Sequence, residues 1–260
     1  MADKKPVIRV FPDPASVAAA AADLFARETR AAAEARGTCT VALSGGSTPE
    51  ALYRLLADRN GPYFSEVPWA ALRLFWGDER HVGPDDAESN YRMTRLALLE
   101  HAPIPSEHIF RVPAENPDAA RVAADYQETL AREFGPGALP RFDLIMLGMG
   151  PDGHTASLFP DSPALAETSR QVAANWVEKF KQYRITFSFP VINHARLVLF
   201  LVTGKSKADV LPEVLSPAAG RSPLPAARIA PEQGRLVWMV DEAAAAHIDP
   251  GLPGVQHVHG

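Results

Sequence analysis

One strand that breaks into a glycine-rich turn constrains this chain more than any other feature. Residues 142–147 are apolar except for Asp143, and glycines follow at 148, 150 and 153. The turn places Asp152 and His154 directly after the strand. A buried strand with such an ending is typical of an open α/β sheet, which builds its active site at the carboxyl edge. Because histidine moves protons near neutral pH, Asp152 and His154 are the first catalytic candidates.

The hydrophobic pattern predicts that strands alternate with helices along the chain. The strands are expected at 7–11, 40–44, 72–76, 142–147, 184–189, 196–202 and 236–240. The helices are expected at 14–36, 49–57, 89–100, 117–134 and 205–215, with a short one from Asp241. This order predicts an α/β fold with a mostly parallel sheet and helices on both faces, a Rossmann-like three-layer architecture.

Length and composition suit a soluble globular protein of one α/β domain or two small ones. No linker divides the chain, so we expect a single domain over 1–260, with a surface excursion at 216–234 and a frayed tail from about 249. The single cysteine, Cys39, excludes an internal disulfide framework and a cysteine zinc cluster.

Charge and hydropathy limit the kinds of partner and the cellular location that can be expected. The formal net charge of −5 lacks the basic excess that a nucleic-acid partner requires. No apolar run reaches the roughly 18 residues that a membrane helix needs, and the first residues lack the core of a signal peptide. The sequence therefore predicts no nucleic-acid partner, no membrane association and a cytoplasmic location.

Two further loops follow expected strands and should meet the first one at the same sheet edge. The loop 44–49 reads Ser-Gly-Gly-Ser-Thr-Pro and opens a helix. Its residues Gly45, Gly46, Ser47 and Thr48 predict a phosphate site, because glycines allow close approach and helix-start amides favour anions. The P-loop pattern is absent, and a tight turn with a serine cap is the simpler alternative.

The third loop, 77–81, carries four titratable residues in a row. A solvated charge run is the ordinary interpretation of such a segment, but its place after a strand favours a functional one. Arg80 is a permanent cation that can hold a carbonyl or phosphate oxygen, and Asp78 can orient Arg80 or a histidine. His81 is a candidate for the cavity wall. Arg184 and Lys205 are candidates to complete a phosphate pocket.

Residues 148–153 also satisfy G-x-G-x-x-G after a strand. A single match is weak evidence for a dinucleotide site, and Asp152 puts a negative charge where a pyrophosphate would bind. We therefore disfavour a nucleotide-dependent oxidoreductase. No spacing typical of metal ligands appears, so no metal is expected.

Four segments together resemble the 6-phosphogluconolactonases, which share a superfamily with the glucosamine-6-phosphate isomerases/deaminases. The matching segments are 43–49, 75–82, 89–93 and 147–160, and the resemblance covers nearly the whole chain. The isomerase branch has a tyrosine where this chain has Arg80, and a glutamate where it has Phe159. These two positions argue for the lactonase branch, and a non-catalytic sugar-phosphate sensor is disfavoured because no DNA-binding module is evident.

The resemblance implies hydrolysis of 6-phospho-D-glucono-1,5-lactone, the second step of the oxidative pentose phosphate pathway, without cofactor or metal. It implies that His154 is the base, that Arg80 stabilises or positions the carbonyl oxygen, and that Asp78 or Asp152 orients them. Phosphate binding would fall to Gly45, Gly46, Ser47, Thr48, Arg184 and Lys205. The expected partner is a sugar-phosphate lactone, and the expected assembly is a monomer or small homo-oligomer.

Overall fold

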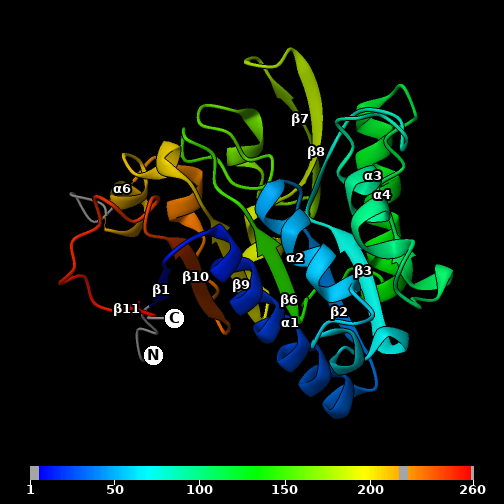
Figure 1. Ribbon diagram of the computed structural model, residues 1–260. Coiled ribbons are helices and arrows are strands. Elements are labelled where there is room, and N and C mark those ends of the chain that lie inside the picture. The colour runs from blue at the N-terminus through cyan, green and yellow to red at the C-terminus, as the bar shows by residue number, and fades with distance from the viewer. Residues whose placement is uncertain (1–5, 217–221, 259–260) are drawn as a thin grey trace.

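A computed structural model describes residues 6–216 and 222–258, and its main element is an eight-stranded sheet (Figure 1). The strand order is β11-β1-β10-β9-β6-β2-β3-β5, and every pairing in it is parallel. These strands are β1 (Val7–Phe11), β2 (Cys39–Leu43), β3 (Leu72–Trp76), β5 (Ile109–Phe110), β6 (Leu144–Leu147), β9 (Leu197–Val202), β10 (Arg235–Asp241) and β11 (Val255–His257). The expected α/β fold with a mostly parallel sheet is confirmed.

The longest helix, α1, begins and ends at the residues that its capping residues predict. The α-helices are α1 (Pro14–Arg36), α2 (Ser47–Ala57), α3 (Asn90–Thr94), α4 (Ala119–Phe134), α5 (Phe189–Asn193) and α6 (Leu211–Leu215). Asp13 caps α1 by accepting from the Ser16 N–H at 2.7 Å, and Gly37 ends it in the left-handed region at φ 77°. Helices α1 and α2 lie side by side across the front of the sheet in Figure 1.

A second, antiparallel sheet of three strands was not expected. It consists of β4 (Asp78–Arg80), β8 (Gln182–Phe187) and β7 (Val172–Val177), in the order β4-β8-β7. The charged run predicted as a loop is therefore partly a strand, because β8 supplies a pairing partner that lies far away in the sequence. The β7–β8 hairpin projects at the top of Figure 1.

Buried tyrosines fix the carboxyl ends of two neighbouring strands. The Tyr53 hydroxyl accepts from the N–H of Ser44 and donates to its carbonyl, at 3.1 and 2.9 Å. The Tyr126 hydroxyl makes the same pair of bonds with Trp76, at 2.8 and 3.1 Å. Burial raises the pKa of both phenols, so they remain neutral. The two loops that follow β2 and β3 thus start from rigid points.

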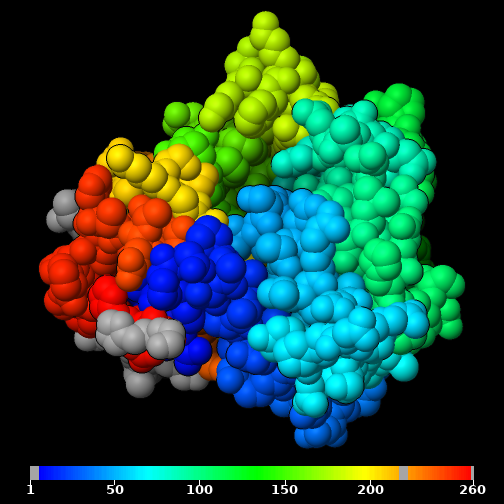
Figure 2. Space-filling model, in the orientation of Figure 1, coloured from blue at the N-terminus to red at the C-terminus, as the bar shows by residue number. Residues whose placement is uncertain are grey.

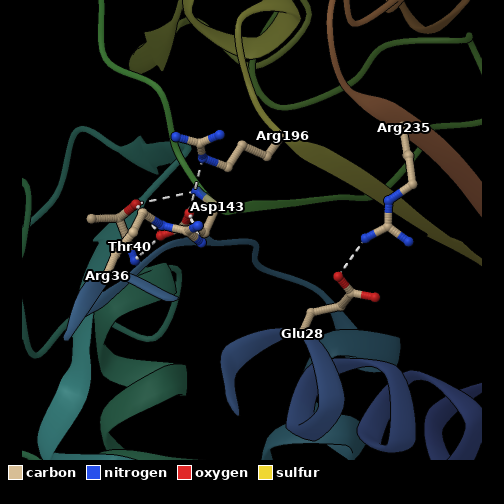
Figure 3. Close-up of polar contacts among 6 residues, drawn as sticks. All are labelled: Glu28, Arg36, Thr40, Asp143, Arg196 and Arg235. Carbon is tan, nitrogen blue, oxygen red and sulfur yellow. Dashed lines mark hydrogen bonds and ion pairs between the residues drawn. The ribbon is translucent and has the colours of Figure 1, made fainter. Parts of the chain in front are cut away.

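Ion pairs hold the other edge of the sheet, where the strands begin (Figure 3). Asp143, just before β6, accepts from Arg36 at 2.7 Å and from the Thr40 N–H at 2.9 Å, and pairs with Arg196 at 3.3 Å. Glu28 of α1 pairs with Arg235 of β10. These contacts join α1 to the starts of β2, β6, β9 and β10.

Three expectations for the later part of the chain were wrong. Residues 205–215 are not one helix: a 3₁₀ turn (Lys205–Lys207) precedes α6, which begins only at Leu211. No helix follows Asp241, where the described chain forms turns. The tail expected to fray contains β11, which pairs with β1 and is preceded by a bond from the Ile8 N–H to the Gly254 carbonyl.

The expected surface excursion at 216–234 is also partly wrong. Residues 217–221 lie outside the described chain, but Pro225 and Ala226 in a 3₁₀ turn (Pro225–Arg228) are buried. The Ala226 N–H donates to the Gly153 carbonyl at 3.0 Å. This segment therefore braces the glycine-rich turn after β6.

Candidate active site

A polar cavity of about 270 Å³ opens where β2, β3, β6 and β9 end. Figure 2 shows this hollow beneath the projecting β7–β8 hairpin and above α2. Seven of the predicted site residues line it: Gly45, Gly46, Ser47, Thr48, Asp78, Arg80 and His154. The structure therefore brings together side chains from all three loops that the sequence singled out.

The start of α2 forms one wall of the cavity. Gly46 precedes the helix at φ 107° and has no side chain to cap it. The first N–H groups of a helix have no acceptor within it, so those of Ser47 and Thr48 are available to a ligand. The Thr48 hydroxyl lies 2.7 Å from that of Thr203, which ties α2 to the loop after β9.

Asn90 joins the first loop to the charged strand β4. Its side-chain amide donates to the Asp78 carbonyl at 2.9 Å, and it packs directly against Gly45. A Cβ at position 45 would lie 2.0 Å from Oδ1 of Asn90, so only glycine fits there. The cavity thus depends on Asn90, which the sequence analysis did not single out as a site residue.

The His154–Asp152 pair lies at the turn after β6. Nδ1 of His154 lies 2.5 Å from Oδ1 of Asp152, and this hydrogen bond is the main reason that the pKa of Asp152 is far below its ordinary value. Gly150 lies against the pair, because a Cβ there would be 2.0 Å from Nδ1. Asp152 stands behind the imidazole and is not part of the cavity wall.

An aromatic stack fixes the plane of the same imidazole. The ring centroids of His154 and Phe159 are 4.0 Å apart, with 26° between the planes. Phe180, in the turn of the hairpin, meets Phe159 edge-on at 5.7 Å. The imidazole is thereby held by Asp152 in one direction and by an apolar face in another.

Strand β4 presents Asp78 and Arg80 to the cavity and buries Glu79 beneath it. Arg80 donates to the Glu88 carbonyl at 2.6 Å, and Asp78 accepts from the Ser157 hydroxyl at 2.7 Å. The Glu79 carboxylate accepts from the N–H groups of Arg80, Asn90 and Tyr91. Burial raises the pKa of Glu79 in spite of these bonds, and its role is to fix the start of α3.

The structure places Lys207, rather than Lys205, at the cavity wall. Lys205 is exposed, whereas Lys207 is partly buried and its pKa is lowered, mainly by that burial. The Gly204 N–H is held by both oxygens of Asp241 at 3.0 Å, which sets the direction of this turn. The sequence signalled a basic turn after β9, but only the turn geometry selects between its two lysines.

Arg184 is buried and pairs with Arg80 in the β4–β8 register, on the same face of these strands, but it does not line the cavity. Burial and the neighbouring Arg80 lower the pKa of Arg184, and its guanidinium lies 5.1 Å from the Phe180 ring centroid. His81 points elsewhere: its Nε2 lies 2.7 Å from the Asn116 carbonyl, and it does not line the cavity.

Other features of the described residues do not offer a competing site. A larger hollow of about 730 Å³ between α4 and the β7–β8 sheet is lined mainly by alanine and proline and has no histidine or lysine in its wall. Within residues 6–216 and 222–258, no three His, Cys, Asp or Glu side chains come together to hold a metal ion. Across these same ranges, no helix is both long and apolar enough to cross a membrane.

The structure is an α/β fold in which an uncapped helix start and the imidazole of a histidine–carboxylate pair line one cavity, an arrangement suited to a small anionic ligand. The profile of the family described as glucosamine-6-phosphate isomerases/6-phosphogluconolactonase matches residues 12–238. The chain belongs to this family.

Individual relatives agree with this membership. The chain is 45% identical over 226 residues to a 6-phosphogluconolactonase of Synechocystis sp., covering 86% of this chain and 90% of that one. The structure of 6-phosphogluconolactonase from Trypanosoma cruzi has a TM-score of 0.82 at 34% identity, covering 94% of this chain and 97% of that one. A monomeric glucosamine-6-phosphate deaminase has a TM-score of 0.76 at 19% identity and shares the fold, with 93% and 99% covered.

Proposed function

We propose that this protein hydrolyses 6-phospho-D-glucono-1,5-lactone to 6-phospho-D-gluconate. The observation that carries the proposal is the placement of His154 and Arg80 on one cavity whose other wall is an uncapped helix start with Lys207 beside it. A dianionic phosphoryl group and a carbonyl group are the two features of this substrate that such walls recognise.

The phosphate end is anchored by the start of α2. The N–H groups of Ser47 and Thr48, their hydroxyls and the Lys207 ammonium supply donors and charge, and Gly45 and Gly46 let the phosphate approach the backbone. Anchoring this end turns binding energy into orientation of the lactone carbonyl at the other end. Arg184, beside Arg80 on the same face of the second sheet, adds positive potential rather than a contact at the wall.

The reacting end is served by His154. Nδ1 is occupied by Asp152, so Nε2 is the nitrogen that takes a proton from water as its oxygen bonds to C1. The imidazolium then returns that proton to the ring oxygen as the bond from C1 to that oxygen breaks. The acid that forms releases its own proton to solvent. Arg80 stabilises the negative carbonyl oxygen of the tetrahedral intermediate, and Asp78 holds the loop beneath it through Ser157.

The sister chemistry, isomerisation or deamination of an amino-sugar phosphate, requires a larger set of acids and bases. Here Phe159 stacks on the imidazole. The isomerase branch has a glutamate at this position. An apolar ring cannot relay a proton between two carbons. This contact favours hydrolysis, which needs one base and one stabilised oxyanion.

The test is a rapid assay on freshly prepared phosphogluconolactone, corrected for spontaneous hydrolysis. Enzymatic turnover without ammonia release from glucosamine 6-phosphate is the expected result. Ammonia release, or lactone loss no faster than in buffer, would reject the proposal. A parallel assay with unphosphorylated gluconolactone shows whether the phosphate is required, and we expect a large loss of kcat/KM without it.

A further inference from the structure

The turn of the β7–β8 hairpin reaches the His154–Asp152 pair from outside the cavity. Nζ of Lys179 lies 3.1 Å from Oδ2 of Asp152, whose other oxygen is the one bonded to His154. The carboxylate thus bridges an imidazole and an ammonium, with one oxygen for each. Lys179 lies in the turn between β7 and β8 of the second sheet, whereas the strand before Asp152 belongs to the first, so this contact joins two parts of the fold at the reacting group.

We propose that Lys179 is a positioning residue for the reaction: it holds Oδ2 of Asp152 so that Oδ1 stays on Nδ1 of His154. The inference rests on the proposed function, because it assumes that His154 is the base. The terminal torsion of an aspartate is broad, and both contacts of Asp152 with His154, to Nδ1 and to the backbone N–H at 3.3 Å, are made by Oδ1 alone. A second partner on the other oxygen fixes the carboxylate plane, and the imidazole then keeps one tautomer and one direction.

The hairpin supports Lys179 in this place. Its ammonium lies 5.5 Å from the ring centroid of Phe180, and Phe180 in turn meets Phe159, which stacks on His154. The Lys179 and Asp152 side chains are 56% and 30% exposed, so their ion pair adds little to the stability of the fold. A contact that stabilises little but meets the catalytic pair is better explained by orientation.

The charges around the His154–Asp152 pair predict the direction in which the pH profile should shift without Lys179. The groups around the pair are Lys179 on the hairpin, Lys207 after β9, and Asp78, Arg80 and Arg184 on the second sheet. Lys179 offsets part of the negative charge of Asp152. Without Lys179 that charge acts more fully on the imidazole and favours its protonated form. The acidic limb of the pH profile should therefore move to higher pH.

The experiment compares Lys179→Met with Lys179→Arg and with the control Lys181→Met in the same turn. Lys181 is exposed and, among the residues that the structure places, pairs with no carboxylate. We expect Lys179→Met to lower kcat about threefold to tenfold, since misorientation costs rate, with KM within about twofold. The midpoint of the acidic limb of the kcat/KM profile should move to higher pH by on the order of half a unit, a small shift because partly exposed charges are screened. Lys179→Arg should retain most activity, and Lys181→Met should match the unmutated protein.

A second readout does not depend on turnover. The ring-proton NMR titration of His154, assigned by its loss in His154→Ala, should shift to higher pH in Lys179→Met and not in Lys181→Met. A raised KM with unchanged kcat would show that Lys179 binds the phosphate instead and would overturn the inference, as would an unshifted titration. Absence of lactone hydrolysis by the unmutated protein would reject the proposed function, whatever the NMR shows.

Discussion

Asp143 and Asp152 flank the same strand, β6, yet their surroundings differ completely. Asp143 is held by Arg36, Arg196 and Thr40, all of which belong to the scaffold (Figure 3). Asp152 is held by His154 and Lys179, and the imidazole that it orients faces a cavity. The two ends of the strand therefore differ, because the partners at one end join parts of the scaffold and those at the other end include an imidazole that lines a cavity.

The difference shows what distinguishes a structural carboxylate from a functional one. The contacts of Asp143 connect the end of α1 and the starts of neighbouring strands, and Asp143 does not line the cavity (Figure 3). Asp152 contacts the imidazole of His154, a titratable group that lines the cavity. These different partners predict a structural role for Asp143 and a functional one for Asp152. Substitutions at the two edges should accordingly separate activity from stability.

Replacement of His154 should have the largest effect on activity. His154→Ala removes the proposed base, and kcat should fall about 10²- to 10⁴-fold with the thermal midpoint nearly unchanged. His81→Ala is the matched control, because His81 lies outside the cavity and bonds to a backbone carbonyl. The measurement is initial-rate lactone hydrolysis. Near-normal turnover by His154→Ala would remove His154 from the mechanism.

Gly150→Ala should have the next largest effect. The new Cβ would lie 2.0 Å from Nδ1 of His154 and 2.7 Å from Oδ1 of Asp152, so the pair must move. A displaced base should lower kcat about 10- to 100-fold, with a smaller change in KM. Gly83→Ala is the control, since nothing lies within 4 Å of its added Cβ. Equal rates for the two variants would mean that the pair does not set the rate.

Lys207→Met should weaken substrate binding and leave the rate of the chemical step nearly unchanged. KM should rise about tenfold, as expected for the loss of one charge-assisted hydrogen bond, with kcat little changed. Lys205→Met is the control, because Lys205 is exposed and lies outside the cavity wall. The opposite result, a raised KM only for Lys205→Met, would restore the sequence-based choice between the two lysines.

The pH dependence of product binding provides a finer test of the same residue. Burial lowers the pKa of Lys207, so its ammonium is lost at a lower pH than that of an exposed lysine. Affinity for 6-phosphogluconate should therefore weaken as pH rises from 7 toward the ordinary lysine value of about 10.4. Lys207→Arg should flatten this dependence, because arginine stays protonated. Calorimetric titration of the product measures both.

At the other edge, Asp143→Ala should change stability and leave activity alone. Losing the partner of Arg36 and of the Thr40 N–H should cost about 1–3 kcal/mol of unfolding free energy. The kcat of the folded variant should stay within about twofold of normal, because no contact of Asp143 reaches the cavity. Urea unfolding and the lactone assay together decide this. A large fall in kcat with unchanged stability would erase the distinction between the two edges.

Local chemistry made much of the fold predictable. Asp13, Pro14 and Gly37 mark the limits of α1 because each acts within one helical turn. The three loops of the site were found because polar residues follow apolar strands, and parallel strands end at one edge. The sequence therefore indicated Ser47, Arg80 and His154 together without any knowledge of their distances.

Features that depend on distant partners were not predictable in this way. The segment Asp78–Arg80 looks like a charged loop, and it is a strand only because β8 pairs with it. The position of Lys207 depends on a 3₁₀ turn that Asp241 holds from the end of β10. Lys179 reaches Asp152 only because the turn of the β7–β8 hairpin lies beside the turn after β6. In each case the deciding contact joins residues far apart in sequence.

The most direct test of the account is a crystal structure of the protein with 6-phosphogluconate bound. We predict that the phosphate lies at the N–H groups of Ser47 and Thr48 beside Lys207, with C1 of the sugar acid between His154 and Arg80. A phosphate bound away from α2, or a C1 carboxylate that faces away from His154, would contradict the assignment of this sheet edge as the catalytic site.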